Sequence, residues 1–138
     1  MKIGKICITP GFFLTVAACF WMVGWEVGIG ILGAFFLHEG AHLLCIYAFG
    51  GRLKRLSLGL SGAEIRTEQG GMGYAGEILS LLAGPGCNLL CALILARMGE
   101  KWYLISGIHV ALGLFNLLPF PGLDGGGILK LLYLMWVE

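Results

Sequence analysis

The chain has 138 residues, of which 58% are hydrophobic and 12% are charged, and its formal net charge is +1. A soluble domain is typically about half apolar and about a quarter charged, so this composition excludes an ordinary soluble protein and indicates one that lies in the lipid bilayer. The near-neutral charge gives no electrostatic case for a nucleic acid partner. We expect one integral membrane domain over residues 1–138.

Four apolar stretches are predicted to cross the membrane as helices. They run from about Ile6 to Trp25, Val27 to Phe49, Tyr74 to Ala96 and Trp102 to Leu118. Each comes close to the roughly 20 residues that a membrane-spanning helix requires. A last short helix is expected over Ile128–Val137. The predicted fold class is therefore an all-α polytopic membrane protein with about four transmembrane helices.

Most of the charge lies in one segment, Arg52–Gly73, between the second and third predicted spans. Leucines recur there mostly at every second position, at Leu53, Leu56, Leu58 and Leu60. Alternation of this kind, with glycines that favour turns, predicts a short β-hairpin. We expect the hairpin to lie at the membrane surface.

The basic residues predict the orientation of the chain in the membrane. Lys2 and Lys5 precede the first span, and Lys130 lies near the C-terminus. The charged hairpin segment carries Arg52, Lys54, Arg55 and Arg66. Because positive residues favour the cytoplasmic side, both termini and the hairpin are expected there. Arg97 and Lys101 oppose this assignment on the other side.

The second predicted span contains His38, Glu39 and His42 near its middle. Residues four apart share one face of a helix, so the two histidines can bind one metal ion, for which zinc is the natural choice. Glu39 can accept a proton from a water in an open metal position. Ionisable groups at this depth are costly and typically functional. The alternative is a polar cluster that holds helices together by hydrogen bonds.

A catalytic zinc ion requires a third protein ligand. The candidates in the membrane region are Glu77, His109, Asp124 and Cys45. Asp124 follows the helix-breaking stretch from Pro119 to Gly122, so an irregular backbone could bring its carboxylate inward. It could equally be a turn residue at the membrane surface. A lone histidine such as His109 is more often a hydrogen-bonded interior residue.

Three motifs resemble those of the site-2 protease family of intramembrane zinc metalloproteases. Phe36–His42 matches the family's HExxH in a membrane helix, Ala83–Asn88 matches Gly-Pro-x-x-Asn, and Asn116–Gly126 matches Asn-x-x-Pro…Leu-Asp-Gly-Gly. The resemblance covers a catalytic core of about residues 27–130. It is most similar to small bacterial members of the family, of which the sporulation factor SpoIVFB is one.

The resemblance implies a site for Zn²⁺ in which His38, His42 and Asp124 are the ligands and Glu39 is catalytic. It implies that Asn88 and Asn116 bind the substrate backbone or stabilise the oxyanion, although a buried asparagine can equally link helices. The charged hairpin resembles membrane-associated strands of the family. Its exposed edge could pair with an unwound substrate segment.

The function implied by the resemblance is that of a zinc metalloendopeptidase in the bacterial plasma membrane. Such an enzyme hydrolyses peptide bonds of membrane-embedded substrates in regulated intramembrane proteolysis. We expect a single-span membrane protein as substrate and a membrane regulatory protein as a further partner. Two alternatives stay open: a catalytically inactive membrane scaffold, and a protein that binds or transports metal ions.

Overall fold

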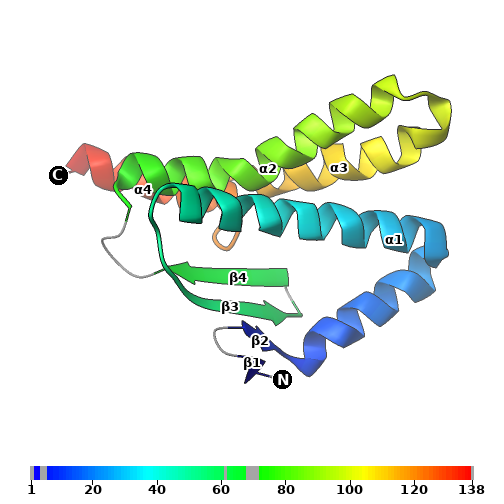
Figure 1. Cartoon of the computed structure of the whole chain (residues 1–138), viewed down its shortest axis with the longest axis horizontal. Helices are drawn as coiled ribbons and strands as arrows, with labels where there is room; N and C mark the ends of the chain where they lie inside the picture. The colour runs from blue at the N-terminus through cyan, green and yellow to red at the C-terminus, as the bar shows by residue number, and fades with distance from the viewer. Residues whose placement is uncertain (1, 4–5, 61, 68–71, 138) are drawn as a thin grey trace.

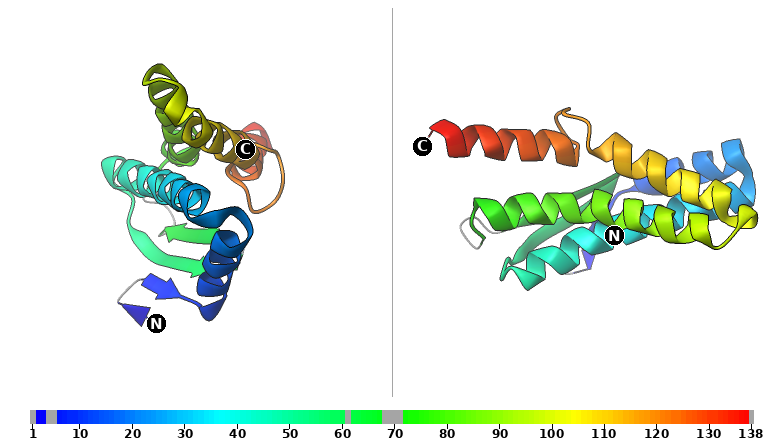
Figure 2. Two further views of the ribbon diagram at one scale, coloured as in Figure 1. Left: turned by 90° about the vertical axis from the view of Figure 1, so that its right-hand side faces the viewer. Right: turned by 90° about the horizontal axis from the view of Figure 1, so that it is seen from above.

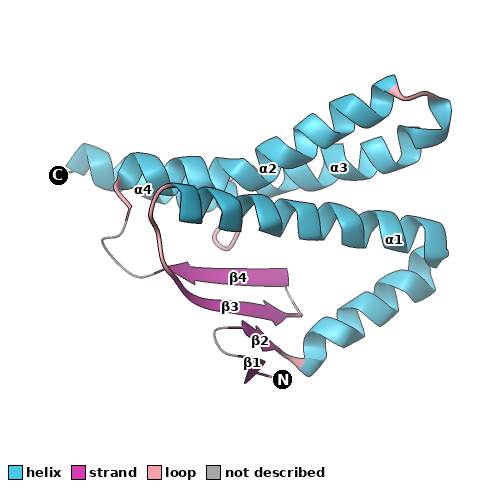
Figure 3. Cartoon of the chain, in the orientation of Figure 1, coloured by secondary structure: helices cyan, strands magenta, loops and turns pink. Residues whose placement is uncertain are grey.

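The structure, a computed structural model, describes residues 2–3, 6–60, 62–67 and 72–137. Lys5 and residues 68–71 of the predicted hairpin segment therefore lie outside the described residues. The elements are, in order, β1 (Lys2–Ile3), β2 (Ile6–Ile8), α1 (Pro10–Ala48), β3 (Leu53–Gly59), β4 (Gly62–Thr67), α2 (Tyr74–Arg97), the short 3-10 helix η1 (Glu100–Trp102), α3 (Tyr103–Asn116) and α4 (Asp124–Val137). The strands gather on one side of α1, away from α2 and α3 (Figures 1 and 3).

Helix α1 consists of two arms that meet at Gly24. The backbone there has φ 80° and ψ 173°, which interrupts the helix. Glycine reaches this region without the steric cost that a Cβ atom imposes. The chain turns back at this residue, so that the second arm runs beside the sheet and carries the histidine motif (Figure 1).

The four strands form one sheet in the order β1-β2-β3-β4. β2 runs parallel to β3, and β3 pairs antiparallel with β4, with Leu56 opposite Ile65. Because β2 and β3 are parallel, the whole of α1 connects them. Leu53, Leu56 and Leu58 are buried on one face of β3 and pack near Phe12 and Phe35 of α1. The sheet therefore packs against one side of α1.

Helices α1 and α2 each bury a stripe of residues spaced four apart, with several small residues in each. The buried stripe on α1 contains Gly30, Ala34, His38, His42 and Ile46. The buried stripe on α2 contains Gly76, Ser80, Gly84, Asn88 and Ala92. Small side chains let helix backbones approach closely within a membrane. α3 contacts both helices, and α4 lies beside α2, roughly in line with α3 (Figure 2).

The outer surface is strongly apolar. Trp21 is 88% exposed, Trp25 is 75% exposed and Leu44 is 73% exposed, and many other large apolar side chains are also exposed. Contiguous apolar surface of this extent indicates contact with a membrane or a partner. Of the helices in the described chain, α1 and α2 are long and apolar enough to cross a membrane.

The structure corrects two expectations about the elements. Ile6–Ile8 forms strand β2, so the prediction that a helix begins there is wrong. The predicted hairpin is confirmed as β3 and β4, but it belongs to a larger sheet. α3 has 14 residues and is shorter than the span expected over Trp102–Leu118, whereas α4 begins at Asp124, before the short helix expected over Ile128–Val137. Among the described residues two helices are candidates for crossing a membrane, so the four spans stay a prediction.

Candidate metal centre

His38 and His42 project from the second arm of α1 towards α2. Both are nearly fully buried, with exposed fractions of 3% and 6%. Their Nε2 atoms are 3.1 Å apart, and the two rings meet edge to face. The four-residue spacing therefore places both imidazoles on one face of the helix, as the sequence predicted.

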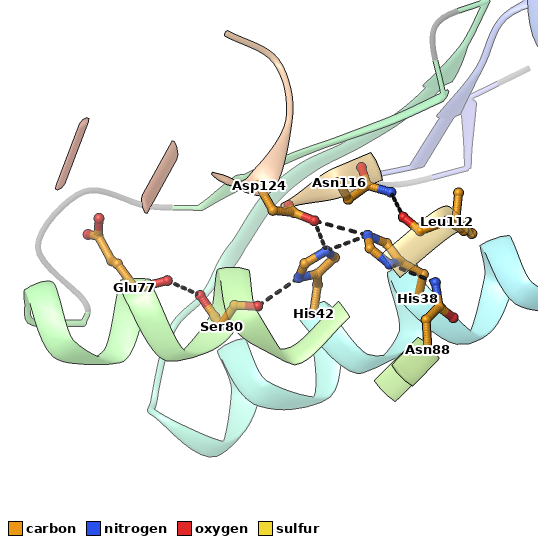
Figure 4. A network of polar contacts seen from close by, with 8 residues as sticks. All are labelled: His38, His42, Glu77, Ser80, Asn88, Leu112, Asn116 and Asp124. Atoms are coloured by element: carbon orange, nitrogen blue, oxygen red, sulfur yellow. Dashed lines mark hydrogen bonds and ion pairs between the residues drawn. The ribbon is translucent and has the colours of Figure 1, made fainter. Parts of the chain in front are cut away.

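Asp124 is the first residue of α4. The chain after α3 turns tightly, and the amide of Leu123 donates to the carbonyl oxygen of Phe120 at 3.1 Å. The turn directs the Asp124 carboxylate at the histidine pair (Figure 4). Its Oδ2 lies 3.0 Å from the Nε2 of His38 and 3.3 Å from the Nε2 of His42.

These three atoms form a triangle of the size that a tetrahedral zinc ion requires. Its sides are 3.0, 3.1 and 3.3 Å. Ligands about 2.0 Å from a tetrahedral zinc ion lie roughly 3.3 Å from one another. Two imidazoles and one carboxylate are also a donor set typical of catalytic zinc. Among the described residues this is the group that could hold a metal, and it contains neither Glu77, His109 nor Cys45.

Helix α2 leaves room for the two imidazoles at Gly84. A Cβ atom at this position would meet the Nε2 of His42 and would lie 2.8 Å from the Nε2 of His38. The next residue, Pro85, has no amide N–H, so the carbonyl group four residues earlier lacks its usual helical donor. The glycine of the Gly-Pro motif therefore lies directly against the two histidine ligand atoms.

A cavity of about 510 Å³ opens beside the triangle. Glu39 lines it together with the three ligands, residues of β4 and Asn116. Glu39 has no hydrogen-bond partner within the part of the chain that the structure describes, so its carboxylate is free to act on a group in the cavity. This arrangement places a base next to the metal site.

The two asparagines of the motifs occupy different surroundings. Asn116 lines the cavity, and its amide nitrogen donates to the carbonyl oxygen of Leu112 at 3.0 Å. Asn88 is completely buried and does not line the cavity. Its side chain lies between His38 and His109, at 3.1 and 3.0 Å. The substrate-binding roles of both residues stay predictions.

Ser80 is a contact of the site that the sequence did not predict. Its carbonyl oxygen accepts a hydrogen bond of 2.6 Å from Nδ1 of His42 (Figure 4). Because this oxygen belongs to the backbone, the identity of residue 80 carries no signal for the contact. The bond fixes the His42 proton on Nδ1 and leaves Nε2 free as a metal ligand.

Comparison of the structure with solved structures identifies a clear relative. A site-2 protease from Methanocaldococcus jannaschii superposes with a TM-score of 0.76 and 23% sequence identity, covering 96% of this chain and 69% of that chain. The chain has the fold of a site-2 protease. The resemblance to the site-2 protease family predicted from the three sequence motifs is thereby confirmed at the level of the fold, whereas the closer similarity to SpoIVFB-like members stays a prediction.

Sequence comparison finds one curated relative. A protein of Synechocystis sp. (strain ATCC 27184 / PCC 6803 / Kazusa), provisionally named a zinc metalloprotease, is 29% identical over 120 residues. The match covers 80% of this chain and 32% of that protein, so the chain spans about a third of this curated relative. No family model matches the chain.

Proposed function

We propose that this protein is an intramembrane zinc metalloprotease that hydrolyses peptide bonds of membrane-embedded proteins. One observation carries the proposal: His38 and His42 of α1 and Asp124 of α4 converge within an apolar helical layer, and their ligand atoms lie within 4.8 Å of one another. Both relatives support a membrane metalloprotease, because one is a site-2 protease and the other is named as a zinc metalloprotease.

Each residue of the site has a separate role in the proposed reaction. Zinc bound to such a ligand set polarises a carbonyl group and lowers the pKa of a bound water to about 7. Glu39 accepts the proton of the attacking water and then delivers it to the leaving amine. Asp124 and the two histidines supply the ligands, and Gly84 keeps the space between them and α2 open. Asn116 lines the cavity, which supports a contact between its side chain and the substrate backbone.

The shape of the cavity favours an extended substrate segment. Strand β4 forms one wall, and it is the last strand of the sheet. An unwound segment of a single-span membrane protein could pair with this edge and present a carbonyl group to the site. A helical substrate would have to unwind first, because its backbone groups are otherwise hydrogen-bonded within the helix.

The position of the ligands weighs against the two alternative functions. A metal transporter is expected to place ligands along a path through the membrane, whereas these three atoms cluster at one point. An inactive scaffold has no need of a carboxylate such as Glu39, which faces the cavity without a hydrogen-bonding partner among the described residues.

The proposed arrangement in the membrane keeps four crossings. They correspond to the first arm of α1, its second arm, α2, and α3 with η1. The basic residues of β3, Lys54 and Arg55, are exposed and support a cytoplasmic location for the sheet and for both termini. The membrane would be the bacterial plasma membrane, the cleavage would be regulated intramembrane proteolysis, and a membrane protein would regulate it.

Replacing Glu39 with glutamine tests the proposal. We expect Glu39→Gln to retain zinc and to lose more than about 100-fold in cleavage of a reconstituted single-span substrate, because general acid–base catalysis typically contributes 10²–10⁴-fold. Zinc content by mass spectrometry and cleavage in proteoliposomes are the two measurements. Glu100→Gln, in the exposed turn before α3, is the matched control. Unchanged cleavage by Glu39→Gln, or a wild-type protein without zinc, would contradict the proposal.

A further inference from the structure

The two histidines of the metal centre contact α2 through their second ring nitrogens in different ways. Nδ1 of His42 donates to the Ser80 carbonyl oxygen, a group that can only accept. Nδ1 of His38 lies 3.1 Å from Nδ2 of Asn88, the nitrogen of an amide group that can donate through one end and accept through the other. The proton position on His42 is thus fixed by the backbone, whereas that on His38 depends on how the amide is turned.

Only one orientation of the Asn88 amide lets His38 bind a metal ion. A neutral imidazole carries one proton, so Nε2 of His38 is a ligand only when the proton is on Nδ1. Nδ1–H then needs an acceptor, which is the amide oxygen of Asn88. In the opposite orientation, which is the one drawn in the structure, the amide nitrogen donates to Nδ1, and the His38 proton moves to Nε2 and blocks the ligand position. The oxygen and nitrogen of an amide have the same shape, so both orientations fit these heavy-atom positions.

His109 of α3 holds the other end of the same amide. Its Nδ1 lies 3.0 Å from Oδ1 of Asn88 in the orientation drawn, and this position is taken by the amide nitrogen when the amide is turned over. Asn88 is 0% exposed and His109 is 4% exposed, so the described protein groups and not bulk water decide the orientation. When the Asn88 oxygen faces His38, its NH₂ group faces His109, which must then accept through Nδ1 and carry its proton on Nε2.

We propose that Asn88 and His109 are positioning residues of the metal centre: His109 orients the Asn88 amide, and Asn88 holds His38 in the tautomer that binds metal. The inference rests on the proposed metal site and assigns a new role to His109, which belongs to none of the three motifs. It gives Asn88 a structural partner on each side, which accounts for its burial away from the cavity. Outer partners of this kind typically change metal affinity by 10–100-fold when they are removed.

Nitrogen NMR on the zinc-loaded wild-type protein tests the tautomers directly. The chain contains three histidines, so ¹⁵N-histidine labelling gives a simple spectrum. His109→Asn removes one set of signals and assigns it. We expect His38 and His42 to carry protons on Nδ1 and His109 to carry its proton on Nε2. A His109 proton on Nδ1 in the zinc-loaded protein would overturn the proposal, although the metal site itself would stand.

Zinc release provides a second, independent measurement. We expect His109→Leu to release zinc to a chelator about tenfold faster than wild type, at the lower end of the range for outer partners. His109→Asn keeps an acceptor near the position of Nδ1 and should release zinc near the wild-type rate. Ser106→Ala is the matched control, because Ser106 is buried on the same helix and bonds to Ala92 instead of the metal centre.

Equal release by His109→Leu and Ser106→Ala would overturn the positioning role. A wild-type protein that binds no zinc would instead overturn the proposed function, and this inference with it. The two failures are therefore distinguishable from the wild-type zinc content alone.

Discussion

The three ligand atoms meet because Gly84 has no side chain. A methyl group at this position would contact the Nε2 atoms of both histidines, where the metal ion belongs. Close backbone approach of this kind is possible only with glycine. The glycine of the Gly-Pro motif is therefore part of the metal site, although it supplies no ligand.

Gly84→Ala should accordingly abolish zinc binding. We expect the zinc content to fall from about one ion per chain to near zero, because the added Cβ atom competes with the ion for space. Gly86→Ala is a matched control on the same helix, since a Cβ atom there would meet nothing within 4 Å. Measured zinc contents that are equal for the two variants would contradict this role of Gly84.

Asp124→Asn tests the third ligand. An asparagine has nearly the same shape but no negative charge, so the site keeps its packing and loses a charged ligand. We expect zinc affinity to fall by more than about 100-fold, beyond the 10–100-fold typical of outer partners. Competition with a chelator of known affinity measures the change. An affinity within tenfold of wild type would mean that Asp124 is not a ligand.

The residue pattern predicted only part of this site. The spacing of His38 and His42 predicts a shared helix face, whatever the tertiary fold. Asp124 lies 82 residues after His42, so no local periodicity connects them, and only the family resemblance selected it among the candidates. The contacts of Ser80 and His109 depend on how three helices pack, and one of them is made by a backbone carbonyl group.

At the scale of elements, Gly24 decides the course of α1. Its φ of 80° and ψ of 173° lie in a region that essentially only glycine adopts and that costs other residues on the order of 1–3 kcal/mol. The residue separates the first arm, which packs Phe12 against the sheet, from the second arm, which packs Phe35 against the sheet and carries the histidines. A shift in this angle would move the first arm relative to the metal site.

We therefore expect Gly24→Ala to lower the melting temperature in detergent, since the alanine must adopt the strained angle or straighten the helix. Gly33→Ala, at an exposed and regular position of the same helix, should leave it unchanged or raise it slightly. Differential scanning fluorimetry of both variants compares the two effects. A similar melting temperature for the two would show that the angle at Gly24 is not needed.

The sheet contains both strands that the sequence predicted and a strand that it did not. Alternating leucines identified the β3–β4 hairpin, because this pattern is local. β2 has only three residues, and Ile6, Cys7 and Ile8 are as apolar as the helix that follows. What makes them a strand is pairing with Leu56, Ser57 and Leu58, about 50 residues away. A short apolar run cannot reveal such a distant partner.

At the scale of the whole molecule, a bound metal ion would link helix α1 to helix α4. Two ligands come from α1 and one comes from α4, which otherwise packs mainly against α2. Any ligand that binds the folded state stabilises it, by about 4 kcal/mol when its concentration is a thousand times its Kd. The folded protein should therefore depend on zinc for stability as well as for chemistry.

We expect chelation to lower the melting temperature of the wild-type protein by several degrees, and added zinc to restore it. His42→Ala should melt at one temperature with or without chelator, because it lacks a ligand. Thermal unfolding monitored by circular dichroism in detergent gives both values. A wild-type protein that contains zinc but melts at the same temperature after its removal would contradict the expected link.

The distance along the chain between His42 and Asp124 also bears on biosynthesis. A ribosome makes both histidines long before it reaches the carboxylate, so the nascent chain has an incomplete set of ligands while α1, α2 and α3 are already being inserted. The set of three ligands cannot be complete until α4 is placed. The order of the sequence thus delays assembly of the metal site until α4 has been made.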